Sequence, residues 1–435
     1  MSARPRVAIV GGGFAGLESA FTLRQRLGDR VDLTLISDRA DFLFKPNTIY
    51  IPYGTDEHKL RIPIARPAAR RLIRFHHGVV SDVENHRVEL ADGSRLPFDF
   101  LVLATGAAMR PAEIPGLAEY AETIWTPAQT RRLGTRFHEL RDAATAGEVR
   151  RVLFLVPPNN KCAGPLYEMV FMLDTWLRRQ GLRDKVAISW TTYEQSYIQA
   201  FGPRLDTVVR AEFARRGIDG HTGKVAVKVA PDEVLYADGS RRGFDLLVAF
   251  PPYVAAVDYP SLPSDERGFL STDPATRLVT GTENVYAPGD AGDFPVKQAF
   301  LAFLQADAVA DDIAGRIDHR NAARARRFDP VSMCVMEMFD TATFAQVPLA
   351  TTGDPARPVR IADDAGDRYR VGVSPVWRLG KKALGVYLPW QFTAGRPFHG
   401  GRAWAGMELA LRGMSRALAT GPERGSEVER SRVSP

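Results

Sequence analysis

The stretch Val7-Ala-Ile-Val10, followed directly by Gly11-Gly12-Gly13-Phe-Ala-Gly16, decides the fold class of this chain. A short apolar strand enters a glycine turn, and a helix is expected from Leu17 to Leu27. Glycine is needed where the backbone must approach a pyrophosphate closely, and a helix start offers free amide groups to that anion. The pattern therefore predicts the first half of a dinucleotide-binding domain.

A second copy of this pattern lies about 145 residues further on but has changed its chemistry. Val152-Leu-Phe-Leu-Val156 runs into Pro157-Pro-Asn-Asn-Lys-Cys162-Ala-Gly-Pro and ends Leu166-Tyr167-Glu168. The glycines of the turn have been lost and a thiol has been gained. We predict a duplicated fold in which the first copy holds a dinucleotide and the second does not.

Two further repeats support the duplication. Leu90-Ala-Asp-Gly-Ser94 leads to a buried strand that ends in Ala104-Thr-Gly106, and Tyr236-Ala-Asp-Gly-Ser240 leads to one that ends in Phe250-Pro-Pro. Both are predicted to be hairpins that feed a buried strand.

A later strand ends at Gly289-Asp290 and precedes a long helix. A carboxylate at this place would suit the ribityl hydroxyls of a flavin.

The predicted fold class is therefore α/β, with two Rossmann-like dinucleotide-binding domains and a C-terminal α+β region that carries an amphipathic helix. Residues 1–110 and 250–325 are expected to form the two parts of the first domain, and residues 111–249 the degenerate second domain with Cys162. Residues 326–420 are expected to form the C-terminal domain with Cys334, and residues 421–435 a disordered tail.

The composition is that of an ordinary globular protein, with 45% hydrophobic and 25% charged residues in a chain of 435. The 57 Lys and Arg against 51 Asp and Glu give a net charge of +6, which is too small and too dispersed to indicate a nucleic-acid partner. The N-terminus lacks the apolar stretch of a secretion signal, and no long apolar window predicts a transmembrane helix. We therefore expect a protein on the cytoplasmic side that does not span a membrane but is free to lie on one.

The chain has two cysteines, Cys162 and Cys334. Cys162 stands at the predicted start of a helix and follows Lys161, so the helix dipole and the ammonium are both expected to favour the thiolate. A reactive nucleophile would suit this place. The alternative is that each cysteine is a small buried apolar residue, which is the common fate of a free cysteine.

The glycine turn, Ala104-Thr-Gly106 and Ala287-Pro-Gly-Asp290 resemble, in order and spacing, the FAD-binding elements of flavoproteins with two dinucleotide folds related to the disulfide reductases. Within that superfamily, Asn160-Lys-Cys162-Ala-Gly-Pro-Leu-Tyr-Glu168 resembles the cysteine segment of sulfide:quinone oxidoreductases and of the flavin subunit of flavocytochrome c sulfide dehydrogenase. Cys334, in Ser332-Met-Cys334-Val-Met, falls where that family carries its partner thiol.

The resemblance implies how the cofactor is held. FAD would be bound without a covalent link, because the third cysteine that some relatives use near the flavin is absent. The residues implied are Gly11, Gly12, Gly13 and Gly16 at the pyrophosphate, Ser37 and Asp38 at the ribose, Val80 at the adenine, Thr105 and Gly106 at a close pass of the chain, and Gly289 and Asp290 at the ribityl chain. Lys297 would support negative charge on the reduced ring.

The resemblance also implies a mechanism. Hydrosulfide attacks a Cys162–Cys334 disulfide or sulfur-bridged pair and leaves a persulfide on one cysteine, and the freed thiolate of Cys334 attacks flavin C4a. The flavin then reduces a membrane quinone, with Phe300 and Phe392 as candidate quinone contacts, and sulfur leaves as sulfane sulfur or polysulfide. Glu168 is expected either to move a proton or only to help packing at its helix start.

The C-terminal region indicates a membrane partner. Apolar residues recur at helical spacing at Trp404, Met407, Leu411, Met414 and Leu418. Such a segment can lie in a lipid interface and lead a quinone to the flavin, or it can pack on the core of the protein or on a sister subunit of a homo-oligomer.

Three other functions stay open on the sequence. The first is sulfide oxidation with a cytochrome as electron acceptor. The second is a type II NADH:quinone oxidoreductase, although Pro157 to Lys161 lack the glycines that NADH binding requires. The third is a non-catalytic flavoprotein that senses redox state through its thiol pair.

Overall fold

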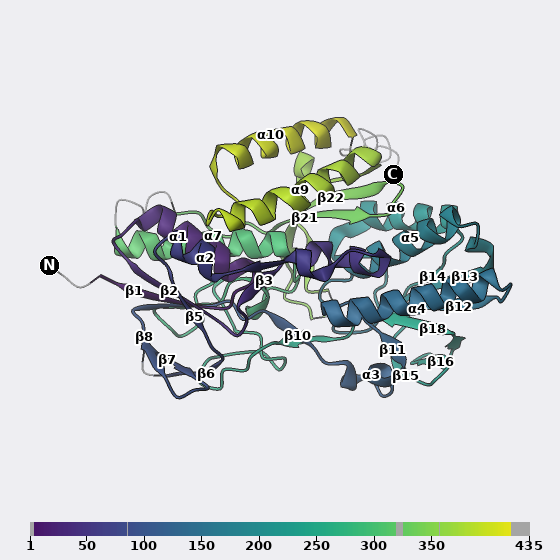
Figure 1. Ribbon diagram of the computed structural model, residues 1–435, viewed down its shortest axis with the longest axis horizontal. Coiled ribbons are helices and arrows are strands. Elements are labelled where there is room, and N and C mark those ends of the chain that lie inside the picture. The colour runs from purple at the N-terminus through teal and green to yellow at the C-terminus, as the bar shows by residue number, and fades with distance from the viewer. Residues whose placement is uncertain (1–3, 85, 319–324, 356, 419–435) are drawn as a thin grey trace, which may run out of the picture.

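The computed structural model describes residues 4–84, 86–318, 325–355 and 357–418. Figure 1 shows two α/β halves side by side, with the C-terminal helices α9 and α10 lying above them. The predicted tail at 421–435 lies outside the described residues.

The first half is built on a five-stranded parallel sheet in the order β20-β9-β1-β2-β5. Its strands are β1 (Arg6–Val10), β2 (Asp32–Ser37), β5 (Arg74–His77), β9 (Phe100–Leu103) and β20 (Val285–Tyr286). Helices α1 (Phe14–Leu27) and α7 (Ala299–Ile317) pack against each other, and the short α2 (Ala65–Ala69) precedes β5. The two parts of this half are thus far apart in sequence.

The second half repeats the arrangement with a parallel sheet in the order β11-β18-β12-β13-β14. Its strands are β11 (Ala121–Glu122), β12 (Arg150–Val156), β13 (Val186–Thr192), β14 (Asp219–His221) and β18 (Leu246–Ala249). Its helices are α3 (Leu117–Tyr120), α4 (Pro127–Thr145), α5 (Gly164–Arg179) and α6 (Gly202–Arg216). The order β18-β12-β13-β14 matches β9-β1-β2-β5, so the predicted fold class and its duplication are confirmed.

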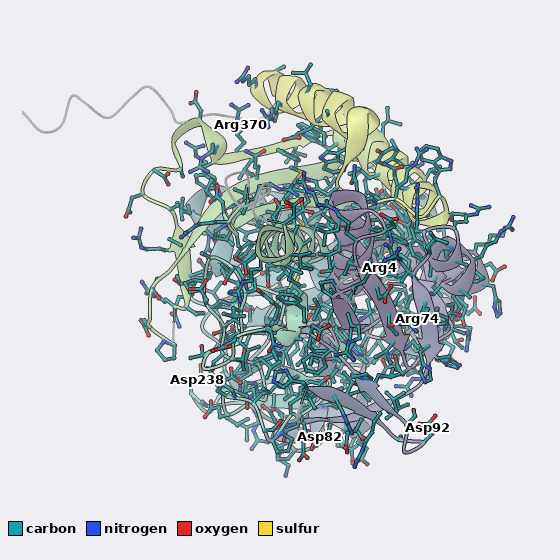
Figure 2. All side chains as sticks on the ribbon, turned by 90° about the vertical axis from the view of Figure 1, so that its left-hand side faces the viewer. Arg4, Arg74, Asp82, Asp92, Asp238 and Arg370 are labelled. Carbon is teal, nitrogen blue, oxygen red and sulfur yellow. The ribbon has the colours of Figure 1, made fainter. Side chains whose placement is uncertain are left out.

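Each half also carries an antiparallel sheet of three strands, and these contain the two predicted hairpins. The first sheet comprises β6 (Val80–Glu84), β7 (Arg87–Leu90) and β8 (Arg95–Pro97), and the second β15 (Ala226–Val229), β16 (Glu233–Tyr236) and β17 (Arg241–Gly243). The Ser94 amide donates to Asp92 Oδ1 at 2.9 Å, and the Ser240 amide donates to Asp238 Oδ1 at 2.9 Å. The repeated Asp-Gly-Ser therefore makes the same turn twice, and Figure 2 labels both aspartates near the rim of the molecule.

The remaining strands connect or cover the two halves. They are β3 (Asp41–Leu43) with β4 (Arg61–Pro63), β10 (Ala107–Met109) with β19 (Tyr253–Ala255), and a C-terminal sheet of β21 (Val331–Glu337), β22 (Ala342–Thr351), β23 (Val359–Ile361) and β24 (Arg370–Ser374). Helices α9 (Pro375–Thr393) and α10 (Gly401–Leu418) follow this sheet.

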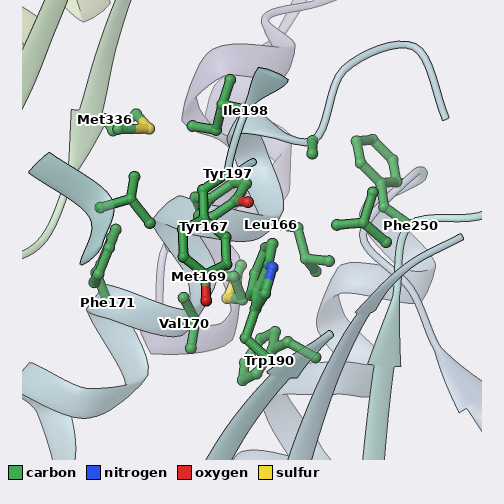
Figure 3. Packing of buried hydrophobic residues seen from close by; sticks show 14 of the residues in the cluster. Leu166, Tyr167, Met169, Val170, Phe171, Trp190, Tyr197, Ile198, Phe250 and Met336 are labelled. Atoms are coloured by element: carbon green, nitrogen blue, oxygen red, sulfur yellow. The ribbon is translucent and has the colours of Figure 1, made fainter. Parts of the chain in front are cut away.

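Helix α5 is apolar on almost every face because it is covered from two directions. Tyr167 packs on Trp190 of the second sheet with ring centroids 3.9 Å apart, and Phe171 also belongs to this aromatic cluster (Figure 3). Met336 of β21 covers the same cluster from the C-terminal sheet. The packing therefore holds the turn before α5, with Cys162, close to the strand that carries Cys334.

Candidate active site

One large cavity, about 1280 Å³ in volume, is lined by residues of both halves and of the C-terminal region. It is large enough for a dinucleotide and a second ligand, since drug-sized ligands occupy pockets of about 300–1000 Å³. Of the residues that the sequence predicted for a site, it is lined by Gly11, Gly12, Gly13, Ser37, Asp38, Val80, Thr105, Gly106, Cys162, Glu168, Asp290, Lys297, Phe300 and Cys334.

The glycine turn has the shape that a pyrophosphate requires. A Cβ atom on Gly11, whose φ is +115°, would lie 2.2 Å from the Ala104 carbonyl oxygen, so only glycine fits there. A Cβ on Gly13, the N-cap of α1, would meet nothing within 4 Å. The first amides of α1 thus face open space at the positive end of the helix dipole, which is a ready-made anion site.

Two predicted cofactor residues, Gly16 and Gly289, do not line the cavity but pack against the residues that form its wall. A Cβ on Gly16 would lie 1.9 Å from the Gly11 carbonyl oxygen, and one on Gly289 would lie 2.9 Å from Ala15 Cβ. Both glycines allow close packing of the backbone around the turn. Gly16 therefore does not face the pyrophosphate as the sequence predicted.

Polar groups along the cavity fit the rest of a flavin dinucleotide. The Asp290 carboxylate faces the cavity without a hydrogen-bond donor in the described part of the chain, which suits ribityl hydroxyls. Asp38 lies at the end of β2, beside Ser37 and Val80, where the ribose and adenine were predicted. The residues present therefore fit FAD.

In the turn between β12 and α5, which corresponds to the first glycine turn, the Asn160 side chain forms hydrogen bonds with the backbone. Asn160 accepts a hydrogen bond from the Cys162 amide at 3.0 Å and donates one to the Phe250 carbonyl at 2.8 Å. Asn159 takes the left-handed conformation, with a φ of 63°, that a glycine would otherwise supply. The Cys162 amide, two residues before the first residue of α5, is therefore already paired, and this turn offers fewer free amides to a second pyrophosphate.

Cys162 and Cys334 both line the cavity as free thiols, from the turn before α5 and from β21. A Cβ placed on Gly164, two residues after Cys162, would lie 4.0 Å from Cys334 Sγ. The absence of a side chain at Gly164 therefore leaves room for Cys334 beside the cysteine turn.

The sequence-based expectation that Cys162 favours its thiolate is not met. Burial raises the pKa of Cys162 well above its ordinary range, and the nearby Cys334 raises it further. Burial also raises the pKa of Cys334 to about 12, with Glu168 adding to the rise and Lys381 opposing it. Burial is the largest cause of the shift for both thiols, and for Cys162 it outweighs the backbone hydrogen bond from Gly164, which lowers the pKa.

Beside the thiols lies a buried ionic network that joins three parts of the chain. Glu168 of α5 accepts hydrogen bonds from Lys381 of α9 and from the Glu337 amide, the latter at 2.7 Å. Glu337 in turn accepts from Tyr50 at 2.8 Å and from Arg378 at 2.7 Å. Burial raises the pKa of Glu168, and the charge and hydrogen bond of Lys381 oppose that rise.

Besides Lys381, three lysines bring positive charge to the cavity wall: Lys45, Lys161 and Lys297. Lys297 donates to the Gly292 carbonyl and lies 3.9 Å from the centroid of the Phe269 ring, and burial lowers its pKa to about 7 while Asp290 opposes that shift. The ammonium that was predicted to support the flavin therefore already contacts the Gly292 carbonyl and the Phe269 ring.

Lys45 was missed by the sequence analysis. It begins the 3-10 helix η1 (Lys45–Tyr53), its ammonium lies 3.4 Å from the centroid of the Trp125 ring, and it has no acceptor in the described part of the chain. Burial lowers its pKa to about 8, and Asp290 opposes that shift. No periodic or motif signal marked this lysine.

Glu194 was also missed. It lines the cavity beyond the cysteine turn, accepts a hydrogen bond from the Gln199 amide at 2.9 Å, and burial raises its pKa to about 7. A buried carboxyl in a cleft is the only general signal that could have found it.

Only one of the two predicted quinone contacts lines the cavity. Phe300 lines the cavity in the first turn of α7. Phe392 is fully buried away from it, stacked on Phe398 at 5.9 Å and packed against Phe42 at 5.0 Å. The structure therefore does not bring Phe392 to the cavity.

Four of the five residues of the predicted apolar face of α10 cover the protein's own core, and the fifth, Leu418, is exposed. Trp404 and Leu411 are buried, and Met407 and Met414 pack beside them over Phe344 and Trp377. The exposed apolar stripe lies instead on α9, where it comprises Val376, Leu379, Ala383, Val386 and Trp390. Among the described helices, none is long and apolar enough to cross a bilayer.

The fold, the glycine turn and the cavity define a class, the FAD-binding oxidoreductases built on two dinucleotide-binding folds. In agreement, residues 5–146 match the family described as pyridine nucleotide-disulphide oxidoreductase.

Within that class, the chain is similar to sulfide:quinone oxidoreductases, which confirms the resemblance stated from the sequence. It is 29% identical over 281 residues to the sulfide-quinone reductase of Aquifex aeolicus, covering 63% of this chain and 63% of that protein. It is 21% identical over 329 residues to the mitochondrial sulfide:quinone oxidoreductase of Dictyostelium discoideum, covering 72% and 71%. The aligned segment thus spans less than two thirds of the length of the Aquifex relative.

Solved structures agree on the fold. The structure of the Aquifex aeolicus sulfide:quinone oxidoreductase superposes with a TM-score of 0.80 at 21% identity, covering 94% of this chain and 96% of that one. The NDH2 of Plasmodium falciparum, solved with NADH, gives a TM-score of 0.65 at 13% identity, covering 91% and 100%.

Proposed function

We propose that this protein oxidises sulfide to sulfane sulfur or polysulfide through Cys162 and Cys334 and passes the electrons through FAD to a membrane quinone. One observation carries the proposal: both thiols line the same cavity as the dinucleotide-binding glycine turn. FAD bound along that turn would supply the two-electron acceptor that links thiol oxidation to quinone reduction. The similarity to sulfide-quinone reductases supports the same reaction class.

The oxidised thiol pair is the electrophile of the first step. Hydrosulfide attacks one sulfur of a Cys162–Cys334 disulfide or sulfur-bridged pair, a new S–S bond forms, and the bond between the two cysteines breaks. One cysteine leaves this step as a persulfide and the other as a thiolate. Because burial disfavours both thiolates, the thiolate that is released has a strong tendency to react further.

Glu168 is placed to hold a proton for this chemistry. It lines the cavity and acts electrostatically on Cys334, and Lys381 keeps part of its charge in place. We propose that Glu168 accepts the proton of the entering sulfur species or of a thiol and that Lys381 sets how readily it does so.

The second turn argues against NADH as the electron donor. Asn160 binds the Cys162 amide and the Phe250 carbonyl in the turn that corresponds to the first glycine turn, so this turn lacks the glycine-lined, free backbone that a second dinucleotide would need. Sulfide is therefore preferred over NADH as the reductant.

For membrane contact we propose the exposed stripe of α9 instead of the predicted stripe of α10. Leu379 and Val386 are 68% and 73% exposed, and Trp390 is 52% exposed. An apolar stripe that ends in tryptophan suits a lipid interface, and a peripheral position on the cytoplasmic side would give quinone access to the cavity. Leu384 and Leu388 of the same helix line the cavity, which brings its wall close to that surface.

The test is anaerobic mixing of the FAD-loaded protein with sulfide or with NADH while the visible flavin absorption is followed, and then addition of a short-chain quinone. We expect bleaching by sulfide and recovery by quinone. Bleaching by NADH alone would falsify the proposal and favour a type II NADH:quinone oxidoreductase. Recovery with cytochrome c but not quinone would favour a cytochrome acceptor, and no bleaching by either donor would favour a non-catalytic redox sensor.

A further inference from the structure

A second cavity, about 300 Å³ in volume, lies between α1 and the turn that joins α9 to α10. Three arginines line it: Arg24 of α1, Arg71 after α2, and Arg396 of the turn. Its lining contains no carboxylate. The turn lies above α1 and α2 at the edge of the C-terminal helices (Figure 1).

Backbone carbonyls hold two of these guanidinium groups in place without neutralising them. Arg24 donates to the Leu72 carbonyl at 2.7 Å and to the Val31 carbonyl at 3.2 Å, and Arg71 donates to the Gly395 carbonyl at 2.7 Å. Arg24 Nε is buried without an acceptor. Asp29 and Asp32 act on Arg24 only from a distance, since neither forms an ion pair with it. The two cations are therefore oriented in advance and keep their charge.

Arg24 and Arg71 are partly buried, whereas Arg396 is the exposed arginine of the site. Its guanidinium lies 5.7 Å from the centroid of the Trp390 ring, and it has no hydrogen-bond or ion-pair partner in the described part of the chain. Trp390 is the last residue of the exposed apolar stripe of α9, and Leu72, beside Arg71, is 77% exposed. The arginine site thus adjoins the surface proposed to contact lipid.

We propose that this cavity binds the phosphate of an anionic phospholipid headgroup. Guanidinium groups bind phosphate through paired charge-assisted hydrogen bonds, and a tryptophan beside them suits the depth of the headgroups. The proposal rests on the membrane contact proposed above and adds a lipid class to it. It would orient the protein at the bilayer, with the lipid phosphate bound at the turn between α9 and α10 and the apolar stripe of α9 lying along the membrane surface.

The experiment is cosedimentation of the full-length, FAD-loaded protein with vesicles of phosphatidylcholine alone or with one third phosphatidylglycerol. We expect at least tenfold tighter binding to the anionic vesicles, and a loss of about fivefold in Arg396→Gln, since each basic residue near such a surface contributes about that factor. Arg396 is exposed and its side chain makes no hydrogen bond to the residues that the structure describes, so its replacement should leave the fold intact. The matched control is Arg87→Gln on strand β7, remote from the site, which should bind as the wild type does.

The outcomes separate the lipid site from the membrane contact on which it rests. Equal binding of the wild type to both vesicles, or an equal loss in Arg87→Gln and Arg396→Gln, would overturn the lipid-phosphate site while membrane contact stands. Binding to neither vesicle would refute membrane contact itself and the site with it. Calorimetric binding of inorganic phosphate that Arg396→Gln abolishes, without any preference for anionic vesicles, would assign the cavity to free phosphate and also overturn the proposal.

Discussion

Lys381 of α9 donates a hydrogen bond to the Glu168 carboxylate of α5 in the wall that also carries Cys334. The contact joins residues 213 positions apart. The C-terminal region therefore does more than cover the two dinucleotide folds, because it supplies the cation that opposes the effect of burial on the pKa of the carboxyl beside the thiols.

Replacement Lys381→Met should raise the pKa of Glu168 further, because the charge that opposes the effect of burial is removed. The rate of sulfide-driven flavin reduction should fall by up to about a hundredfold at neutral pH, the usual size of a proton-transfer effect. It should recover partly at higher pH, where the carboxyl ionises again. Stopped-flow traces from pH 6 to 9 check this, and Lys382→Met, on the exposed side of the same helix, is the control. A flat pH profile would assign Lys381 to packing alone.

Replacement Cys334→Ser should abolish sulfide-driven bleaching, with a loss of about a thousandfold or more, while FAD stays bound. The serine fits the same space beside Gly164 but cannot form a disulfide or a persulfide. Flavin content by absorbance and rapid-mixing rates give the two readouts. Full retention of the sulfide reaction would remove Cys334 from the mechanism.

Replacement Lys45→Met should make the two-electron reduction potential of the bound flavin more negative by about 20–40 mV, because a cation facing the cavity favours negative charge in it. Since the pKa of Lys45 is lowered to about 8, the difference from wild type should shrink above pH 8 as the ammonium of the wild type loses its proton. Equilibration with redox dyes at pH 7 and 9 measures this. Lys59→Met, an exposed lysine of η2 (Glu57–Leu60), carries the same charge change and should leave the potential unchanged.

Glu194 should make the protein less stable as pH rises. Its pKa is about 7 in the folded state against about 4.5 in the unfolded state, so the folded state binds the proton more tightly. The free energy of unfolding should therefore decrease as pH rises from about 4.5 to 7 and level off above that. Urea unfolding of Glu194→Gln across this range should show a shallower decrease than the wild type. Parallel curves for the two proteins would contradict the assignment.

Replacement Leu379→Asp should weaken binding to neutral vesicles by tenfold or more, since burial of one leucine side chain is worth about 1.5–3 kcal/mol. Val227→Asp, an exposed apolar position on β15 of the second half, is the matched control. Removal of α10 is a poor test because Trp404 and Leu411 belong to the core. Unchanged sedimentation of Leu379→Asp would assign the α9 stripe to another role.

Much of the fold could be predicted because it depends on local rules. The glycine turn at Gly11, the Asp-Gly-Ser hairpins and the repeated strands all encode their structure within a few residues. The site could be predicted only where a motif marks it, as at Cys162 and Asp290.

The rest depends on contacts that join distant parts of the chain. Periodicity indicated an apolar face on α10 but could not tell whether lipid or Phe344 and Trp377 would cover it. The hydrogen bond from Asn160 to the Phe250 carbonyl spans 90 positions, and the burial that raises the pKa of Cys162 comes from surroundings that no short segment contains. Lys45 begins the 3-10 helix η1 and Glu194 lies in a bend, and neither segment has an apolar periodicity that would mark these residues in the sequence.

The two hydrogen bonds of Asn160 bear on which electron donor the protein would select. They join the Cys162 amide to the Phe250 carbonyl in the turn that stands where the first copy has its glycines. Under the proposed function, flavin reduction by sulfide would then proceed at the same rate whatever the ratio of NADH to NAD in the surrounding solution.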